Sequence, residues 1–403
     1  MTNETRHWLL PDGVDELLPE AAERVERLRR GLLDLYAGWG YRLVITPFVE
    51  YLESLLTATG QDLAHQTFKL IDPLSGRMLG IRADITPQVA RIDAHQLDCD
   101  EPVRLCYMGS VLRTRPDGFF GGRAPMQIGA ELYGHAGLES DLEILCLMLA
   151  TLELAGIADP YLDLGHVGIF RGLARQAGLD GAAEAALFEA LQRKAVPEIE
   201  TLVAQLGLDP AAGGRFVALA GLNGGPEVFE RAERALAGAG DEVLAAVATL
   251  RQAGERLARR RPGLAVHYDL AELRGYQYQN GLVFAAFVPG SGREIARGGR
   301  YDAIGRKFGR ARPATGFSTD LKILMRFGGG GQAAPREVVL APWRDDDGQL
   351  DQLVESLRAA GAVVVRELPG QAGDAASMGC SHRLVYRNDH WEKVPVEPSP
   401  NPS

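Results

Sequence analysis

An acid and a hydroxyl lie two residues apart where an expected strand runs into an expected helix. The run 82–87 reads Arg-Ala-Asp-Ile-Thr-Pro, with Asp84 and Thr86 at the junction. A carboxylate in this place, close to a free helix N-terminus, can receive an ammonium group. Asp84 is equally a standard N-cap residue, whose side chain accepts hydrogen bonds from the first helical turn. The sequence leaves both interpretations open.

A second polar set follows on two neighbouring strand-like segments, 103–113 and 124–133. Gln127 and Glu131 are four residues apart, so on a strand their side chains point to the same face. A carboxylate beside an amide on a sheet floor suits an amino-acid or imidazole ligand, and Arg113 ends the preceding segment. The alternative is an ordinary solvated strand face.

A third set lies in the segment 273–284, where Arg274 and Tyr278 precede an apolar strand. A guanidinium group there could pair with a ligand carboxylate while aromatic rings exclude water. Tyrosine and glutamine on an alternating strand are also common surface residues, so this segment is only moderately specific.

Glycines mark a fourth segment, 296–302, which is followed by 314–324. We interpret it as a tight turn, then a strand leading into a helix, a layout that lets backbone approach a ligand. Activation of a nucleotide would need an arginine on the first helical turn to neutralise phosphate. Ile323 stands where that arginine is expected.

Composition narrows the function classes. The 403 residues carry a net charge of −10, which disfavours tRNA or duplex binding over a broad surface. Four scattered cysteines indicate a reducing compartment, and neither a signal peptide nor an apolar run of ~20 residues is present. We therefore expect a cytoplasmic chain without membrane contact. Cys380, His382 and His390 have the only metal-like spacing, and we predict no metal site.

The elements expected around these residues form an α+β fold. Strands come in hairpin-linked runs, which predicts a mostly antiparallel sheet flanked by helices. The Ala-, Leu- and Glu-rich part of about 168–262 predicts a helical insertion. We expect a main domain over 1–327, a glycine-rich linker at 328–335, a small α/β segment at 336–394 and a disordered tail at 395–403. Individual elements expected are helices at 19–39, 86–91, 140–154 and 350–360, and strands at 41–46, 66–71, 78–82, 103–113, 124–133, 264–270, 282–288, 294–296, 337–341 and 362–366, with a hairpin at 383–394.

Several segments, in this order, resemble the catalytic domain of histidyl-tRNA synthetase over roughly residues 8–327. The resemblance implies a class II synthetase-like fold with a helical insertion, and a self-dimer built partly from the N-terminal helix and strand. The segments are Leu-Pro-Asp-Gly at 10–13, Gly-Tyr-Arg-Leu-Val-Ile-Thr-Pro at 40–47, Arg-Ala-Asp-Ile-Thr at 82–86, Arg-Gly-Tyr-Gln-Tyr-Gln-Asn-Gly at 274–281 and Gly-Gly-Arg-Tyr-Asp at 298–302.

The departures from that family are informative. Ile323 replaces the arginine that holds ATP in the last motif, Thr114 and Arg115 follow Arg113 where an acid is usual, and Gln279 replaces a tyrosine. The anticodon-binding domain is replaced by a shorter segment. This combination, with Ala-Thr-Gly-Phe-Ser-Thr-Asp-Leu at 314–321, resembles the regulatory subunit of ATP phosphoribosyltransferase, a catalytically silent paralogue.

The resemblance implies a partner and an effector. Members of that family pair with a short-form catalytic subunit, which joins ATP to phosphoribosyl pyrophosphate in the first step of histidine biosynthesis, in a hetero-octamer of four plus four. L-Histidine is the implied feedback effector, and no catalytic residue, cofactor or tRNA partner is implied. The implied histidine-binding residues are Asp84, Thr86, Arg113, Gln127, Glu131, Arg274 and Tyr278.

The resemblance also implies a role for each part of the ligand. Asp84 and Gln127 would hold the α-amino group, Glu131 would face the imidazole, and Arg274 would lie near the carboxylate. An active histidyl-tRNA synthetase, or a related adenylate-forming enzyme, is the alternative, with Arg113 and Arg123 as phosphate contacts. A paralogue with another ligand, or a purely structural dimer, is the third possibility.

Overall fold

The computed structural model describes residues 9–396, except 58–60, 98, 117–121, 277, 330–336 and 372. The chain divides into two compact units, Met1–Gly331 and Gln332–Ser403. Most of the expected glycine-rich linker and the tail beyond residue 396 lie outside the described residues, as does the glycine-rich loop at 117–121. Each unit is considered by itself.

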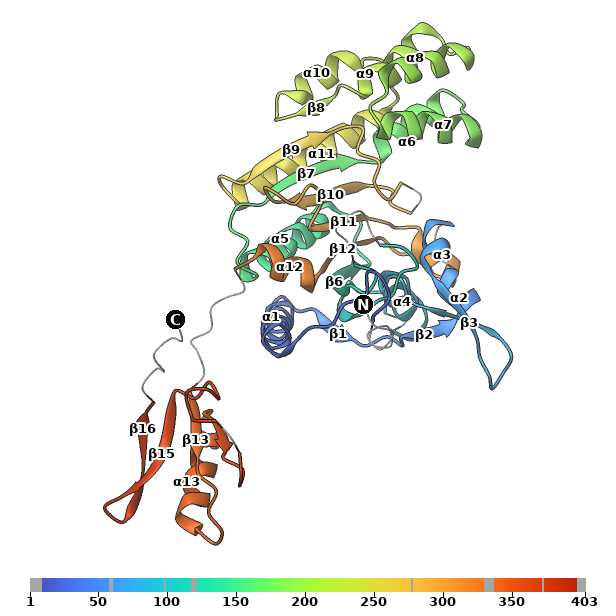
Figure 1. Ribbon diagram of the computed structural model, residues 1–403. Helices are drawn as coiled ribbons and strands as arrows, with labels where there is room; N and C mark the ends of the chain where they lie inside the picture. The colour runs from blue at the N-terminus through green and yellow to red at the C-terminus, as the bar shows by residue number, and fades with distance from the viewer. Residues whose placement is uncertain are drawn as a thin grey trace. The chain divides into compact units, whose positions relative to one another are not determined.

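A nine-stranded sheet organises the described part of the first unit (Figure 1). Its strand order is β1-β5-β6-β12-β11-β10-β7-β9-β8. β1 pairs with β5, and β7 with β9, in parallel, whereas the other pairs are antiparallel. The strands are β1 (Arg42–Val44), β5 (Val103–Ser110), β6 (Met126–Tyr133), β7 (Tyr161–His166), β8 (Asn223–Gly224), β9 (Ala265–Asp269), β10 (Leu282–Phe287), β11 (Ala296–Arg300) and β12 (Ala314–Asp320). The mostly antiparallel sheet is as predicted.

Several local features differ from the sequence-based expectation. The strand β2 (Val49–Tyr51) and the helices α2 (Leu52–Leu56) and α3 (Gln61–Gln66) were not expected. Pro395, expected in a disordered tail, ends β16.

Two further differences lie in the large sheet. Strand β7 was not expected, although the alternation of buried Leu162 and Leu164 is a strand signal. Gly298 and Gly299 do not form a tight turn but lie within β11. A Cβ on Gly298 would lie 2.2 Å from the carbonyl oxygen of Gly316, so these glycines allow close packing of backbone rather than a reversal.

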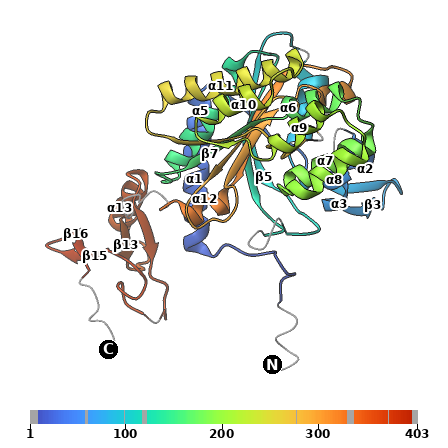
Figure 2. The same cartoon turned by 90° about the horizontal axis from the view of Figure 1, so that it is seen from above.

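One face of the sheet is covered by helices α1 (Pro19–Gly38), α5 (Leu138–Leu154), α11 (Asp241–Arg260) and α12 (Leu321–Phe327). Figure 2 shows α5 and α11 alongside one another over the strands. Alternate residues of β6, namely Ile128, Ala130 and Leu132, point into the apolar core under these helices. The residues between them must therefore point to the opposite face.

That opposite face carries the short helix α4 (Thr86–Ile92) and the turns η2 (Asp93–Leu97) and η3 (Ile304–Phe308) around a smaller core. A three-stranded sheet of β2 (Val49–Tyr51), β4 (Met78–Ile81) and β3 (Phe68–Ile71) lies next to α4 in sequence. The helices α2 (Leu52–Leu56) and α3 (Gln61–Gln66) accompany it. Thus α4, which begins two residues after Asp84, is fixed on the face to which Glu131 points.

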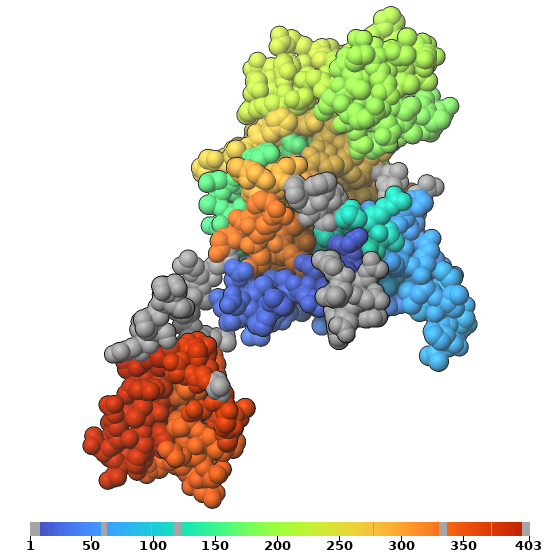
Figure 3. Space-filling view, viewed as in Figure 1, coloured from blue at the N-terminus to red at the C-terminus, as the bar shows by residue number. Residues whose placement is uncertain are grey.

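The expected insertion is mainly helical and forms a lobe beyond β9, as Figure 3 shows in green and yellow. Its apolar side chains, among them Phe170, Phe216 and Phe229, are buried in the same continuous core as α5. The remaining helices of this segment are α6 (Gly168–Gln176), α7 (Gly181–Gln192), α8 (Val196–Gln205), α9 (Pro210–Leu219) and α10 (Val228–Ala235).

The second unit contains a four-stranded sheet in the order β14-β13-β15-β16 and one helix. The β-α-β unit and the terminal hairpin expected from the sequence are both present. Asn388 and Asp389 have φ of 48° and 61°, the left-handed backbone that a tight two-residue hairpin turn needs. The elements are β13 (Val338–Ala341), α13 (Gly348–Ala359), β14 (Val363–Arg366), β15 (His382–Arg387) and β16 (His390–Pro395).

Candidate functional site: a polar cavity on the sheet

The floor of the site is the face of β6 opposite α5. Gln127 and Glu131 both point there, as their spacing predicted. The Gln127 side chain donates to Asp84 Oδ1 (2.7 Å) and accepts from the backbone N–H of Ile85 (3.0 Å). Asp84 Oδ1 also accepts from the backbone N–H of Thr86 (3.2 Å). The N-cap of α4 is Ile85 and no side chain caps this helix, so the interpretation of Asp84 as the N-cap residue was wrong. Asp84 binds the N–H of Thr86 from one position earlier in the chain, and it lines a cavity.

Glu131 is buried, with an exposed fraction of 1%. Its carboxyl group accepts hydrogen bonds from Thr86 Oγ1 (3.0 Å), Tyr107 Oη (3.1 Å) and Tyr301 Oη. Burial is the largest cause that raises the pKa of Glu131 to about 8. At neutral pH this group is mostly protonated, so it can donate as well as accept a hydrogen bond.

A cavity opens above this floor and is lined by six of the seven predicted site residues. Tyr278 lies at its exposed side, with an exposed fraction of 46%. Small residues keep the floor open: a Cβ on Gly316 would lie 1.5 Å from Glu131 Oε2. The predicted residues in the lining are Asp84, Thr86, Arg113, Gln127, Glu131 and Tyr278, joined by Gln279, Arg297 and Tyr301 among others.

Arg274, the seventh predicted residue, lies elsewhere. It forms ion pairs with Glu272 (2.6 Å), with Asp163 on β7 (2.9 Å) and with Glu294 (3.7 Å). Its guanidinium group also lies over the ring of Phe287 on β10. β7 and β10 are beyond β11 as seen from β6, so Arg274 lines a neighbouring cavity rather than the one above Glu131.

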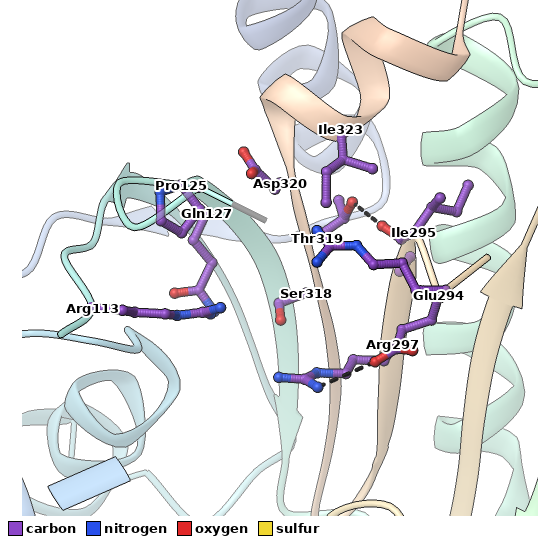
Figure 4. A pocket seen from close by; sticks show the side chains of 13 residues that line it. Arg113, Pro125, Gln127, Glu294, Ile295, Arg297, Ser318, Thr319, Asp320 and Ile323 are labelled. Atoms are coloured by element: carbon purple, nitrogen blue, oxygen red, sulfur yellow. Dashed lines mark hydrogen bonds and ion pairs between the residues drawn. The ribbon is translucent and has the colours of Figure 1, made fainter. Parts of the chain in front are cut away.

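A second cavity adjoins the first at Arg113, Gln127 and Arg297 (Figure 4). Ile323 lines it, so an aliphatic side chain does stand where a phosphate-binding arginine was sought. Lys322, the next residue back, is turned away: its Nζ binds Asp15 Oδ1 (2.6 Å) and the carbonyl oxygen of Ala124 (3.0 Å).

The second cavity nevertheless contains cations at other positions. Arg293 and Arg297 both line the second cavity, with Arg113 on the other side. Sequence reasoning missed Arg293 and Arg297. The signal for Arg297 was the alternation of β11, because Arg300 and Gly298 belong to the α5 face and Arg297 to the other.

Arg123 was the other expected phosphate contact, and the structure gives it a different role. Its guanidinium group donates to the carbonyl oxygens of Arg113 (3.0 Å) and Asp12 (3.2 Å) and lies over the ring of Phe68. Arg123 thus fastens the N-terminal segment to the end of β5. It is absent from the described lining of both cavities.

The sequence also raised the questions of a metal site and of a membrane-spanning segment. Among the residues that the structure describes, no three histidine, cysteine or acidic side chains converge as metal ligands. His382 instead pairs with Glu337, His390 pairs with Glu392, and Cys380 is buried in a small apolar cluster. No helix in the described ranges has the length and apolarity to cross a bilayer.

The fold and the cavity together define a class II synthetase-like protein, and the family model described as histidyl-tRNA synthetase matches residues 13–324. The second unit decides between branches of that class, because residues 336–394 match the model described as the ATP phosphoribosyltransferase subunit HisZ C-terminal domain. The chain belongs to the family of ATP phosphoribosyltransferase regulatory subunits. This confirms the resemblance on which the sequence analysis depended.

Relatives that match over nearly their full length have the name of the same family. A protein of Alkalilimnicola ehrlichii named ATP phosphoribosyltransferase regulatory subunit is 58% identical over 95% of both chains. One of the same name from Thioalkalivibrio sulfidiphilus is 56% identical over 97% of this chain and 98% of its own. These relatives support a regulatory subunit over an active histidyl-tRNA synthetase.

Solved structures are similar over nearly the whole chain. That of an ATP phosphoribosyltransferase regulatory subunit/histidyl-tRNA synthetase from Bacillus halodurans has a TM-score of 0.80 at 27% identity, covering 92% of this chain and 96% of its own. A histidyl-tRNA synthetase from Nostoc, with a TM-score of 0.76 at 20% identity over 96% and 97%, shows the shared fold alone.

Proposed function

We propose that this chain is a non-catalytic subunit that senses L-histidine for a short-form ATP phosphoribosyltransferase. The observation that carries the proposal is the pairing of two features in one cleft. Asp84, Gln127 and Glu131 line a polar cavity suited to an amino acid. The adjoining cavity presents aliphatic Ile323 where nucleotide activation needs an arginine.

In this proposal the ligand groups match the cavity. Asp84 and Gln127 hold the α-ammonium group, while Glu131, fixed by Thr86 and Tyr107, hydrogen-bonds the imidazole ring. Feedback requires that histidine bind the active and inactive assemblies with different affinities. Histidine then shifts the partner subunit toward the inactive assembly.

The proposed assembly is a hetero-octamer of four copies of this chain, paired as dimers, and four catalytic subunits in the cytoplasm. The proposal includes no tRNA, metal or cofactor. The family name supports a catalytic partner, and light scattering on the co-purified complex measures the stoichiometry. A mass that fits two plus two, or no complex at all, would contradict this arrangement.

The decisive experiment assays the short-form catalytic subunit alone and with this chain. We expect phosphoribosyl transfer to need both chains and histidine to inhibit the mixture. Histidine-dependent pyrophosphate exchange by this chain alone should stay at background, and exchange above background would favour the synthetase alternative.

A matched pair of variants tests the cavity. Glu131→Gln should lower histidine sensitivity by about tenfold or more, because an amide, unlike the carboxyl group, cannot release a proton to form a charge-assisted hydrogen bond with the imidazole ring. Glu200→Gln, on the exposed side of α8, makes the same chemical change away from the cavity. If Glu131→Gln and Glu200→Gln remain equally histidine-sensitive while both assemble, the effector binds elsewhere.

A further inference from the structure

The cavity above Glu131 has an arginine that the sequence did not single out. Arg297 lies on β11, where it pairs with Ser318 of β12, and Ser318 in turn pairs with Gly129 of β6. Arg297 is therefore level with Gly129, which is two residues before Glu131 on β6, and its side chain lies on the same face of the sheet as that of Glu131. Neighbouring strands are about 5 Å apart, so an arginine side chain from β11 reaches over β12 toward the floor of the cavity.

Arg297 is not alone at this point. Figure 4 shows the guanidinium groups of Arg113 and Arg297 pointing toward one another from opposite sides, with Ser318 between them. Both residues line both cavities. Two like charges that converge on one cavity repel each other and favour an anion between them.

The rival candidate, Arg274, is in a poor environment for an anion. Its one positive charge faces the carboxylates of Glu272, Asp163 and Glu294. Glu294 is shared with Arg297, so three carboxylates face two guanidinium groups and the local charge is −1. A ligand carboxylate brought there would be repelled and would have to displace buried partners, since the Glu272 side chain is only 9% exposed.

The ion pair that Arg297 forms with Glu294 restrains its side chain less than the ion pairs of Arg274 restrain that arginine. Its ion pair with Glu294 is 3.3 Å long, and the two side chains are 48% and 27% exposed. Exposed pairs of this kind contribute little to stability, so the guanidinium group can turn to a ligand at small cost. Its planar fork matches a carboxylate with two parallel hydrogen bonds.

We propose that Arg297, opposite Arg113, binds the α-carboxylate of the amino-acid ligand, and that Arg274 holds β7 and β10 together instead. The proposal rests on the histidine-sensing function proposed above and reassigns one of its contacts. The ligand then lies along the row from Glu131 to Arg297, with its ammonium group toward Asp84.

The test compares L-histidine with L-histidinol, which keeps the imidazole and ammonium groups but has a hydroxymethyl group in place of the carboxylate. Calorimetry is done on the complete assembly and on this chain. We expect wild type to prefer histidine by about tenfold or more. Arg297→Gln should lose that preference by weakening histidine binding while changing histidinol binding less than about twofold.

Two controls make the result specific. Arg293→Gln removes a charge that lines only the second of the two cavities, and should keep the wild-type preference. Arg274→Gln should also keep it. Retention of the preference by Arg297→Gln, or its loss in Arg274→Gln alone, overturns the reassignment but leaves histidine sensing intact. If wild type binds neither compound, the sensing function itself fails.

Discussion

At the scale of single residues, the site is governed by burial of polar groups. Glu131 has a hydroxyl partner on three sides, yet burial outweighs these hydrogen bonds and keeps its pKa high. A carboxyl group held mostly neutral is adaptable, because it can donate to one imidazole nitrogen or accept from the other. In the function that we propose, this group meets an imidazole ring whose own protonation varies near neutral pH.

This pKa predicts a pH dependence of stability. The pKa of Glu131 is about 8 in the folded chain against 4.5 in the reference state. The folded chain therefore holds a proton that the unfolded chain releases, so stability falls as pH rises between these values. The slope is at most about 1.4 kcal/mol per pH unit for one group.

Thermal or urea unfolding across this pH range checks the prediction. The neutral isostere Glu131→Gln lacks the titration, so wild type should lose stability relative to the variant as pH rises. A constant difference between the two proteins from about pH 5 to pH 8 would show that the Glu131 proton is not held.

Gly316 gives a second prediction at this scale. Gly316→Ala would place a methyl group against Glu131, so we expect a loss of about 2 kcal/mol in unfolding free energy. Gly214→Ala is the control, because nothing lies within 4 Å of a Cβ at that exposed position in α9. The control should be stabilised by about 0.5–1 kcal/mol. Equal effects of the two changes in urea unfolding would contradict the crowded floor.

At the scale of elements, one buried ion pair ties helix α5 to strand β11. Arg300 Nη2 lies 3.0 Å from Asp141 Oδ2, and both side chains are almost inaccessible, at 8% and 4%. The same guanidinium group donates to Ser140 Oγ and to the carbonyl oxygens of His135 and Gly137. Arg300 therefore binds the residues that lead into α5 as well as the carboxylate of Asp141.

Loss of this arginine should be costly. Arg300→Met leaves Asp141 buried without its cation, and we expect a loss of about 3–5 kcal/mol at neutral pH. Burial already raises the pKa of Asp141 above its usual range. Asp141 in the variant should take up a proton as pH falls, so the deficit should shrink in acid. Urea unfolding at several pH values measures this.

The control for that experiment is the exposed pair of Arg27 and Glu23 on α1, 3.0 Å apart. Arg27→Met should change the unfolding free energy by less than about 0.5 kcal/mol, because water screens the pair. If Arg300→Met were equally mild, the pair would not fasten α5 to the sheet.

At the scale of the whole molecule, the two units have separate cores. Val339, Leu350, Val354 and Leu384 form an apolar cluster within the second unit, while the first has its own continuous core. A compact unit that has its own hydrophobic core can fold and unfold without the rest of the chain. We therefore predict that a chain ending at Gly331 keeps the melting temperature of the first unit to within about 2 °C.

Calorimetry on the truncated and complete chains tests this independence. A chain ending at Asp320 is the contrasting truncation, since it also loses α12 with buried Leu321 and Leu324. It should melt well below the chain ending at Gly331. A large drop for both truncations would mean that the second unit is needed for folding of the first.

The sequence by itself determined the class of fold, most strands and helices, and the family, and six of the seven site residues predicted from it line one cavity. Period-two alternation placed Gln127 and Glu131 on one face, and proline, glycine and Asn-Asp signals ended the elements, because these are local properties of the chain. The sequence did not predict strand β7 or the position of Gly298 within β11, because both depend on the strands with which a segment pairs in the sheet.

Only the tertiary structure decided which arginine reaches the cavity. Arg274 and Arg297 carry the same charge in similar sequence surroundings, and their local patterns do not separate them. Packing brought Glu272 and Asp163 against Arg274, placed Glu294 within reach of both arginines, and left Arg297 facing Arg113. The electrostatic environment of an arginine is set by all the charges around it, and many of these come from residues distant in sequence. These charges come close to the arginine only when the strands have paired.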